Sequence, residues 1–465
     1  MKNYLKSLLK NTINIKQLNV EPNASAQYGA NSFYNSNKLE KEIIEPEHFE
    51  AKNFSAYKQC HDFSVLKGIL KLDNQASIIT ILEQSGLSGC GGANFPVAVK
   101  WQAALANPGP RCLIINGQEG ELYTFKDYML MKEHAKTVVE GAALAALAID
   151  ASEVIIAINS GYIACINQVK QALAELLKVF PQLAVRNMRV VGGPKPDLYI
   201  CGEETALIEY LENNRGEPQL KPPYPFQSGY KGRPTVVQNV ETIAWLPLIL
   251  QNKQLFAENG HLKLVHIYGA VNKPGIYQVA IGTSLKALMK IAGGIKQGSE
   301  LSAIEVGGLA GGLLPVDKIE CSFAHQEMSQ LGAMVGTGSV NFLDQHSCLI
   351  DVALRAMEFF RNESCGRCTP CRVGTHELLR IADIMTERNL ADDEYTWFEK
   401  VTRTMVNTST CGLGKGAPSI LVSLLRYWHV ADGKTQLKQQ NHQSDQCHKQ
   451  DDNHQQASNS VKSLG

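Results

Sequence analysis

The sequence predicts a multidomain α/β protein, and three observations support this fold class. Between about residues 65 and 250, short apolar segments alternate with amphipathic helical stretches, which is the pattern of βαβ units around a parallel sheet. The composition, with 38 glycines, 44% hydrophobic residues and 19% charged residues, is typical of glycine-rich α/β enzymes. The 465 residues also exceed what one hydrophobic core usually serves, so we expect two or three folded units.

The first predicted unit is the α/β domain. Its expected strands lie at 112–115, 154–158 and 188–191, and its expected helices at 132–149 and 166–180. The segment 221–234 that follows contains prolines at 222, 223, 225 and 234 and glycines at 229 and 232. So many prolines and glycines exclude a helix or a central strand in this segment, and they predict a surface loop over a site.

Two further units are predicted downstream. Apolar segments between 262 and 317 surround a helical stretch at 284–291, which indicates a small β-rich domain of mixed α+β type. After residue 347 the chain is expected to be helical, with an apolar stripe that includes Leu349, Val352 and Met357.

Both ends of the chain differ in composition from the middle. Residues 1–60 show no sustained period, and the residues past 433 are mostly Gln, Asn, His and Ser, so we expect an arm or loose extension and a disordered tail. The predicted organisation is an N-terminal extension (1–60), an α/β domain (61–250), a β-rich domain (251–340), a helical domain (341–432) and the tail (433–465).

Charge and hydropathy exclude two classes of partner. Lys and Arg number 45, as do Asp and Glu, so no basic field exists to attract nucleic acid or an anionic membrane. The longest apolar runs, such as 142–149, are far shorter than the roughly 20 residues that span a bilayer. We therefore expect no nucleic-acid partner and no direct membrane insertion.

The strongest motif is ESCGRCTPCR, in which Cys365, Cys368 and Cys371 are three residues apart, and Cys411 follows in STCGLG. Three close thiolates with one remote thiolate are typical of a 4Fe–4S cluster. Zinc is the alternative, but zinc sites usually combine two separated CxxC pairs or cysteine with histidine. Four buried thiols without a ligand are a further alternative, which the loop-forming Gly366 disfavours.

Two segments have features of a nucleotide site. In SGLSGCGGANFPVAVKW, the adjacent Gly91 and Gly92 would let the backbone approach a phosphate or a ring closely. The loop matches neither the GxGxxG nor the Walker A pattern, so a tight turn is the alternative interpretation. In NGQEGELYTFKDYML, Asn116 and Glu119 follow a strand at the position where open α/β sheets bind ligands, with an exposed loop as the alternative.

Acidic residues precede a helical run in YICGEETALIEYL. Glu203 and Glu204 are placed there to cap the positive end of a helix. The same carboxylates would also suit the hydroxyl groups of a ribose, and both interpretations remain open.

Together these segments resemble the flavoprotein subunit of respiratory NADH:quinone oxidoreductase (complex I) and the related diaphorase subunits of NAD-reducing formate dehydrogenases and hydrogenases. The likeness covers about residues 85–425, with the motifs GLSGCGGANFPVAVKW, YICGEETALIE, KPPYP, GRPTVVQNVET and ESCGRCTPCR. It implies a Rossmann-like FMN/NADH domain with a parallel sheet, then a small ubiquitin-like β-rich (SLBB) domain and a C-terminal helical iron–sulfur domain.

The resemblance also implies roles for individual residues. The positions that match flavin contacts of the family are Gly89, Gly91, Gly92, Lys100, Asn116, Glu119, Tyr199, Gly202, Glu203, Val237, Asn239 and Thr242. Those that match its NADH contacts are Phe95, Glu121, Glu204, Lys221 and Tyr224. The aromatic rings of Phe95 and Tyr224 are expected to stack on the adenine. Acidic groups near the adenosine ribose would favour NADH over NADPH by repelling a 2′-phosphate.

The implied activity is that of an FMN-dependent NADH dehydrogenase subunit. Hydride would pass from NADH to FMN, and single electrons would pass to one 4Fe–4S cluster. The expected partners are a thioredoxin-like 2Fe–2S subunit and a larger iron–sulfur subunit, with quinone as the final acceptor. No catalytic side chain is expected, because hydride transfer requires positioning and not proton transfer. The expected location is cytoplasmic, peripheral on the cytoplasmic face of the inner membrane if the protein is part of complex I.

Several positions depart from the family pattern. Cys90 replaces arginine, Asn94 glycine, Gln118 aspartate and Gln238 asparagine, and Leu122 and Tyr123 replace Pro–Gly. Two alternatives therefore remain besides the complex I subunit. One is the diaphorase subunit of an NAD-linked formate dehydrogenase or hydrogenase, and the other is a non-catalytic iron–sulfur electron-transfer or assembly subunit without flavin turnover.

Overall fold

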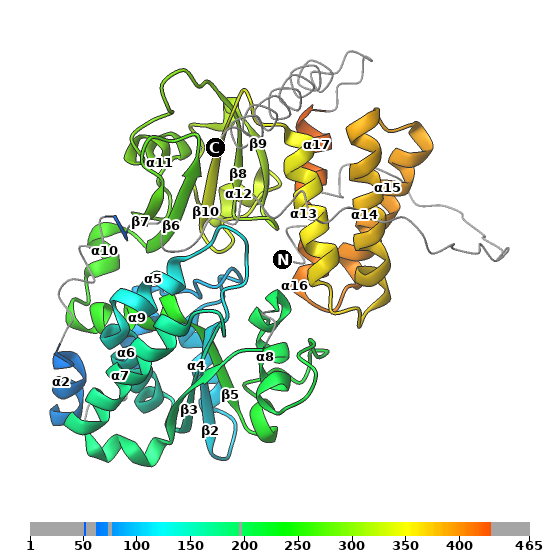
Figure 1. Cartoon of the computed structure of the whole chain (residues 1–465). Coiled ribbons are helices and arrows are strands. Elements are labelled where there is room, and N and C mark those ends of the chain that lie inside the picture. Colours follow the sequence, from blue (N-terminus) through cyan, green and yellow to red (C-terminus); the bar gives the residue numbers. More distant parts are fainter. Residues whose placement is uncertain (1–50, 53–61, 73–76, 195–197, 429–465) are drawn as a thin grey trace, which may run out of the picture.

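A computed structural model describes residues 51–52, 62–72, 77–194 and 198–428. In this part of the chain an α/β unit, a β-rich unit and a helical bundle follow one another in sequence (Figure 1). The predictions for the tail and for most of residues 1–60 lie outside the described residues.

The α/β unit contains a parallel sheet in the order β4-β3-β2-β5. Its strands are β2 (Arg111–Gly117), β3 (Ala151–Ile158), β4 (Met188–Gly192) and β5 (Thr235–Asn239). The central strand β2 places Ile114 opposite Ile155 on one side and Val237 on the other. The three predicted strands are confirmed, and β5 was not predicted because its five residues directly follow a proline-rich loop.

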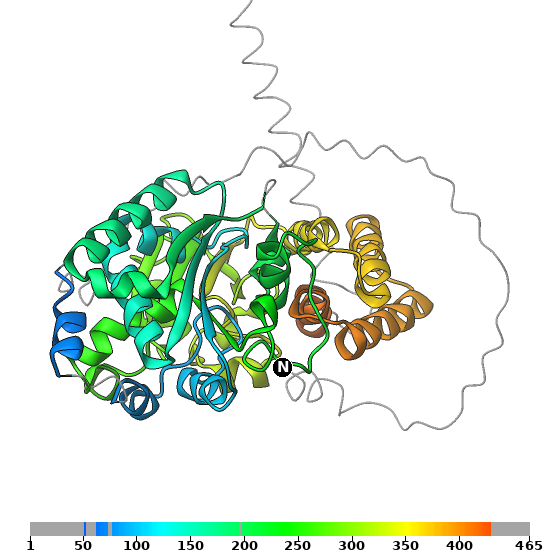
Figure 2. The ribbon, with the colours of Figure 1, turned by 90° about the horizontal axis from the view of Figure 1, so that it is seen from below.

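Helices cover both faces of this sheet (Figure 2). One face carries α5 (Lys126–Glu133), α6 (Ala135–Ala148), α7 (Ile163–Val179) and α9 (Val240–Gln251), which share a core with Leu113 and Ile115 of β2. On the other face, Leu207 and Ile208 of α8 (Glu204–Leu211) pack with Ile114. Successive residues of a strand point to opposite faces of the sheet. Because helices cover both faces, the residues on each face are apolar.

The predicted helix at 132–149 is confirmed over most of its length, but its predicted beginning is wrong. The structure has two helices here, because His134 leaves helical geometry with φ −125° and ψ 33° between α5 and α6. Gly141 lies in the middle of α6, where a Cβ atom would be 2.2 Å from the carbonyl oxygen of Ile243 in α9. This close helix contact explains a glycine within a helix, where it otherwise costs stability.

The β-rich unit has a sheet in the order β1-β7-β6-β10-β8-β9. Its strands are β1 (Ala51–Lys52), β6 (Leu262–Gly269), β7 (Gly275–Ala280), β8 (Leu301–Val306), β9 (Gly312–Pro315) and β10 (Ser339–Asp344), with helices α11 (Leu285–Ile291) and α12 (His325–Gln330). Strand β1 pairs in parallel with β7, so a short part of the N-terminal extension joins this sheet. The predicted α+β character of the unit is confirmed.

The C-terminal bundle consists of α13 (Leu349–Glu363), α14 (Thr369–Glu387), α15 (Asp392–Thr408), α16 (Gly412–Gly416) and α17 (Ser419–Trp428). It contacts the β-rich unit through α17, where Ser423 Oγ accepts a hydrogen bond of 2.8 Å from the Leu313 backbone in β9. The remaining helices are α2 (Ser64–Leu72), α3 (Ser77–Ser85), α4 (Val97–Leu105) and α10 (Leu255–Asn259). None of the helices in the described ranges is both long and apolar enough to cross a membrane.

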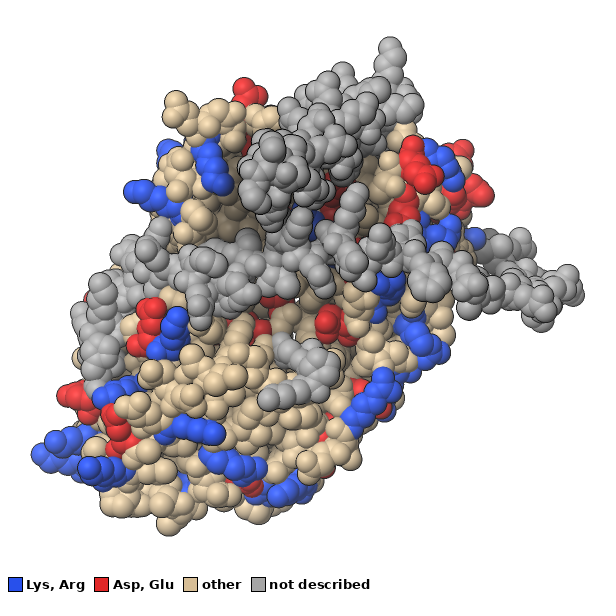
Figure 3. Space-filling model, in the orientation of Figure 1, with Lys and Arg blue, Asp and Glu red and all other residues tan. Residues whose placement is uncertain are grey.

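The surface agrees with the balanced composition. On the described part of the face shown in Figure 3, both basic and acidic side chains occur, and uncharged residues cover most of the surface.

Candidate functional site

The residues predicted to bind a nucleotide gather at the carboxyl edge of the parallel sheet. Asn116, near the end of β2, donates from Nδ2 to the carbonyl oxygen of Gly202 at 2.8 Å. Lys100 of α4 donates from Nζ to the carbonyl oxygen of Val237 in β5 at 3.2 Å. Segments far apart in sequence thus meet where open α/β sheets bind their ligands.

The glycine loop lies against β5 and the start of α9. The loop closes through a hydrogen bond of 2.9 Å from the Gly89 N–H to the Phe95 carbonyl, and the Cys90 N–H donates to Thr242 Oγ1 at 2.9 Å. A Cβ atom on Gly91 would be 3.2 Å from Cβ of Asn239. Gly92 has φ +106° and Asn94 has φ +49°, values that glycine adopts freely and asparagine tolerates.

Gln118 is a buried polar side chain in the loop after β2, and its amide lies on the β4 side of the sheet edge. It is 8% exposed, and neither of its amide atoms has a hydrogen-bond partner among the described residues. Its amide lies against Gly193, where a Cβ atom would be 2.3 Å from Nε2. Leaving such a group unpaired costs about 1–3 kcal/mol, so a polar ligand would relieve it. The close-approach loop and this amide fit a flavin nucleotide.

A chain of alternating charges lies at the beginning of α8. Glu204 is bound by Lys100 at 3.0 Å and by Lys221 at 2.7 Å, and Lys221 also bonds Glu203 at 2.9 Å. Glu203 caps α8, since it accepts hydrogen bonds from two N–H groups of the first turn at 2.8 and 3.0 Å. Burial would raise the pKa of Glu204, but Lys100 and Lys221 outweigh burial and lower it. Glu204 is therefore ionised at neutral pH.

This ionised carboxylate leads to a test of nucleotide preference. Glu204→Gln should reduce the preference for NADH over NADPH about tenfold, because a neutral amide no longer repels a 2′-phosphate. The measurement is the ratio of kcat/KM for the two nucleotides. Glu209→Gln is the matched control, since Glu209 lies on the same helix and its carboxylate accepts a hydrogen bond of 3.0 Å from the exposed Asn214. An unchanged ratio in Glu204→Gln would remove this role.

The aromatic and acidic residues expected on the NADH side differ in their exposure. Phe95 and Tyr224 are exposed at 46% and 44%, and Tyr224 stacks on Phe226 with ring centroids 5.3 Å apart. Glu121 is buried and accepts hydrogen bonds from Thr337 Oγ1 at 2.7 Å and the Leu309 N–H at 3.1 Å. Burial raises the pKa of Glu121 to about 7. Its described partners thus belong to the β-rich unit.

Glu119, expected among the flavin contacts, has a structural partner as well. It is buried, and its two carboxylate oxygens accept 2.9 Å hydrogen bonds from the N–H groups of Asp127 and Tyr128. These groups belong to the first turn of α5, so Glu119 caps that helix and holds the loop after β2 in place.

A buried charge network lies beneath the glycine loop, and the sequence did not predict it. Lys126 is 1% exposed, and its Nζ lies 2.7 Å from Asp127 Oδ1 and 3.2 Å from Glu241 Oε2. Lys263 Nζ lies 3.4 Å from the same Glu241 oxygen and donates to the Cys90 carbonyl at 3.0 Å. Burial would raise the pKa of Glu241, but both lysines lower it. The FKD segment is a weak signal for Lys126, whereas nothing in the sequence indicated Lys263.

This network gives a physical reason for the unusual Cys90. The thiol is 7% exposed, and burial, followed by the nearby Glu241, raises its pKa to about 12. The residue is therefore neutral. An arginine at position 90 would add a third cation beside Lys126 and Lys263.

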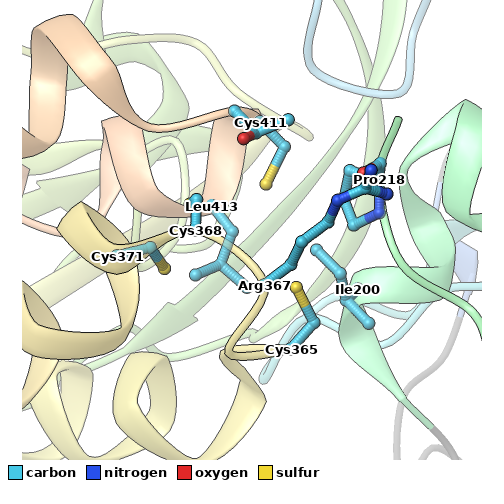
Figure 4. Close-up of a pocket in the computed structure, with 9 residues that line it drawn as sticks. Ile200, Pro218, Cys365, Arg367, Cys368, Cys371, Cys411 and Leu413 are labelled. Atoms are coloured by element: carbon cyan, nitrogen blue, oxygen red, sulfur yellow. Dashed lines mark hydrogen bonds between the residues drawn. The ribbon is translucent and has the colours of Figure 1, made fainter. Parts of the chain in front are cut away.

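The four motif cysteines surround one cavity (Figure 4). Cys365 and Cys368 lie in the loop between α13 and α14, Cys371 lies in the first turn of α14, and Cys411 directly precedes α16. The cavity is lined by Ile200, Pro218, Cys365, Arg367, Cys368, Cys371, Thr410, Cys411 and Leu413. Gly366, with φ +74°, makes the turn between the first two cysteines.

The arrangement of the thiols agrees with a cluster site. The four thiols lie around one cavity, which suits a cubane whose thiolates bind different irons.

One short 3₁₀ helix, Tyr199–Gly202, touches both candidate sites. Ile200 lines the cysteine cavity, and Gly202 accepts the hydrogen bond of Asn116 on the nucleotide side. The Tyr199 N–H donates to Glu363 Oε2 of α13 at 2.9 Å, which ties this turn to the bundle. The two sites are therefore separated by a single turn of backbone.

Family models match the chain in three places. Residues 82–248 match the Nuo51 FMN-binding domain, residues 264–313 the SLBB domain, and residues 351–431 the NADH-ubiquinone oxidoreductase-F iron–sulfur binding region. These matches agree with the glycine loop, which a flavin could approach closely, and with the cavity surrounded by four cysteines.

Curated relatives and solved structures agree with these matches. The chain is 36% identical to the F-subunit of NADH-quinone oxidoreductase from Aquifex aeolicus, over 74% of this chain and 82% of the relative. It is 30% identical to the NADP-reducing hydrogenase subunit HndC of Solidesulfovibrio fructosivorans, over 75% and 74% of the two chains. An NAD+-reducing NiFe-hydrogenase structure in the H2-reduced state superposes with a TM-score of 0.76 at 30% identity, covering 84% of this chain and 67% of that chain. The protein belongs to the family of NADH-quinone oxidoreductase F-subunits and related hydrogenase subunits, with an FMN-binding region and a 4Fe–4S region.

Proposed function

We propose that this protein is an NADH dehydrogenase subunit that oxidises NADH with FMN and passes the electrons to a 4Fe–4S cluster. The observation that carries the proposal is the turn Tyr199–Gly202, which contacts the candidate flavin site and the cysteine cavity at once. A two-electron and a one-electron carrier bound on the two sides of this turn would form an electron path within one chain.

Bound FMN would accept a hydride from the nicotinamide and release its electrons singly. The protein's own part is to bind and orient. The glycine loop permits close approach of its backbone, the Gln118 amide offers a buried donor and acceptor, and Lys100 supplies a positive charge beside Val237. Phe95 and Tyr224 offer exposed rings at the nucleotide side. Cys365, Cys368, Cys371 and Cys411 would bind the cluster irons.

The direct test is the composition and activity of anaerobically purified protein. We expect about one FMN and about four irons per chain, and NADH-dependent reduction of ferricyanide. Protein that binds iron but no flavin, even within its complex, would support the non-catalytic electron-transfer subunit instead. Stoichiometric zinc in place of iron would contradict the cluster assignment.

Gln118 provides a test of flavin tuning. Gln118→Asp restores the family residue and should lower the midpoint potential of the flavin by about 30 mV, a tenfold change for a two-electron couple, because a negative charge disfavours the reduced flavin. Gln118→Asn is the control, since it has the length of aspartate without its charge. The measurement is a spectroscopic redox titration. Equal potentials in the two variants would show that the charge at position 118 has no influence.

We also propose the partners and the place of the protein in the cell. Electrons would leave to a thioredoxin-like 2Fe–2S subunit and a larger iron–sulfur subunit. The protein would be cytoplasmic, and as part of complex I it would lie on the cytoplasmic face of the inner membrane. A hydrogenase-linked diaphorase is the second candidate, favoured by the similarity to HndC and to the NAD+-reducing hydrogenase. The domain limits 61–250, 251–340 and 341–432 remain a proposal. The end of α9 at Gln251 supports the first boundary, whereas β10 (Ser339–Asp344) of the β-rich sheet crosses the second, which therefore lies between Asp344 and the beginning of α13 at Leu349.

A further inference from the structure

Two arginines connect the cysteine loop to the segment that follows α8. Arg367 lies between Cys365 and Cys368, and its Nη1 donates to the Pro218 carbonyl at 2.8 Å. In return, Arg215 Nη2 donates to the Cys365 carbonyl. Figure 4 shows Arg367 extending along the cavity toward Pro218. Beside the cavity, the loop that carries the cluster ligands and the α/β unit are therefore joined by hydrogen bonds in both directions.

These groups leave a positive charge at the cavity wall. The Glu217 carboxylate lies 3.8 Å from Arg367 Nη1 and 3.6 Å from Arg215 Nη1. Two guanidinium groups and one carboxylate give a net charge of +1 (2 − 1). Arg215 is 72% exposed at its side chain, so water screens its field, whereas Arg367 is 33% exposed and itself lines the cavity. Arg367 is thus the cation with the stronger influence inside the cavity.

We propose that Arg367 tunes the cluster by raising its reduction potential. Reduction would add one electron to a cluster that is already bound by four negatively charged thiolates. A fixed cation in the cavity wall would stabilise this added negative charge. The hydrogen bond to Pro218 holds the guanidinium on the wall formed by the α/β unit, where Ile200 also lines the cavity. The charge is therefore placed on the side from which electrons would arrive. This inference rests on the 4Fe–4S cluster of the proposed function and not on the oxidation of NADH.

The experiment is an anaerobic redox titration of the full chain, with dithionite and mediators, followed by electron paramagnetic resonance of the reduced cluster. Arg367→Met keeps much of the side-chain length and removes the charge. We expect its midpoint potential to fall by at least 59 mV, which is a tenfold change in the equilibrium constant of a one-electron reduction. Arg367→Lys keeps the charge and should retain most of the original potential.

Arg380→Met is the matched control. Arg380 lies on α14, the helix that follows the cysteine loop, but it pairs with Glu377 at 3.2 Å and does not line the cavity. Equal midpoint potentials in Arg367→Met and Arg380→Met would overturn the proposal. If Arg367→Met binds no iron, Arg367→Gln is the second neutral variant: a fall of 59 mV or more relative to Arg367→Lys supports the charge effect, and equal potentials in Arg367→Gln and Arg367→Lys contradict it.

The titration uses neither NADH nor flavin. A wild-type protein that binds the cluster but does not oxidise NADH would therefore contradict the proposed activity and leave this result intact. A wild-type protein without iron would overturn both.

Discussion

Replacing Cys411 with alanine is expected to remove the 4Fe–4S cluster, lowering the iron content from about four per chain to near zero. Cys365, Cys368 and Cys371 come from one loop and the helix turn behind it, whereas the fourth thiolate, Cys411, comes from the separate segment before α16. Without the fourth thiolate, one iron corner lacks its protein ligand. The measurements are iron analysis and the electron paramagnetic resonance signal of the reduced protein.

Cys348→Ala is the control for this change. Cys348 is a partly buried cysteine of the same bundle that directly precedes α13 and does not line the cavity. We expect this variant to keep its iron and its signal. Full iron content in Cys411→Ala, or equal losses in the two variants, would contradict the assignment of Cys411 as a ligand.

The second large effect is expected from Lys126→Met, which should lower the free energy of unfolding by about 3–5 kcal/mol. Lys126 lies between Asp127 and Glu241, at 2.7 and 3.2 Å, and all three side chains are at most 5% exposed. Removing the lysine leaves both carboxylates buried, with Lys263 near Glu241 as the remaining cation of this network and with hydrogen bonds from Asn239 and the Leu264 N–H that carry no full charge. The measurement is denaturant-induced unfolding, with FMN content as a second reading.

The control exchanges a lysine of a surface pair. Lys136 of α6 bonds Glu175 at 2.8 Å, but both side chains are at least 40% exposed, so water replaces the lost contact. Lys136→Met should unfold like the wild type within experimental error. Similar unfolding of the Lys126 and Lys136 variants would show that the buried network contributes no more than a surface pair.

The Lys126→Met exchange should also weaken the binding of the flavin. Lys126 also donates to Asn239 Oδ1 at 3.3 Å, and Asn239 packs against Gly91 of the glycine loop. The network thus supports the segments expected to surround the flavin. We therefore expect FMN content to fall along with stability, whereas the Lys136 variant should keep its flavin.

The sequence by itself determined the fold class and predicted three neighbouring cluster ligands, because both depend on local patterns. Buried strands such as β2 and β3 are continuous apolar runs, and their alternation with helices is readable without any contact information. The spacing of Cys365, Cys368 and Cys371 is likewise local, since one loop must present three thiolates to one cluster.

Only the tertiary structure decided how the charged residues are used. Lys126, Glu241 and Lys263 come from three separate elements, and their pairing follows from the packing of α5, α9 and β6 beneath the glycine loop. In the same way, Glu119 caps α5 and Glu121 bonds the β-rich unit, although their motif indicates ligand contacts. A carboxylate takes the partner that offsets its burial, and which partner is within reach depends on the assembled chain and not on its neighbours in sequence.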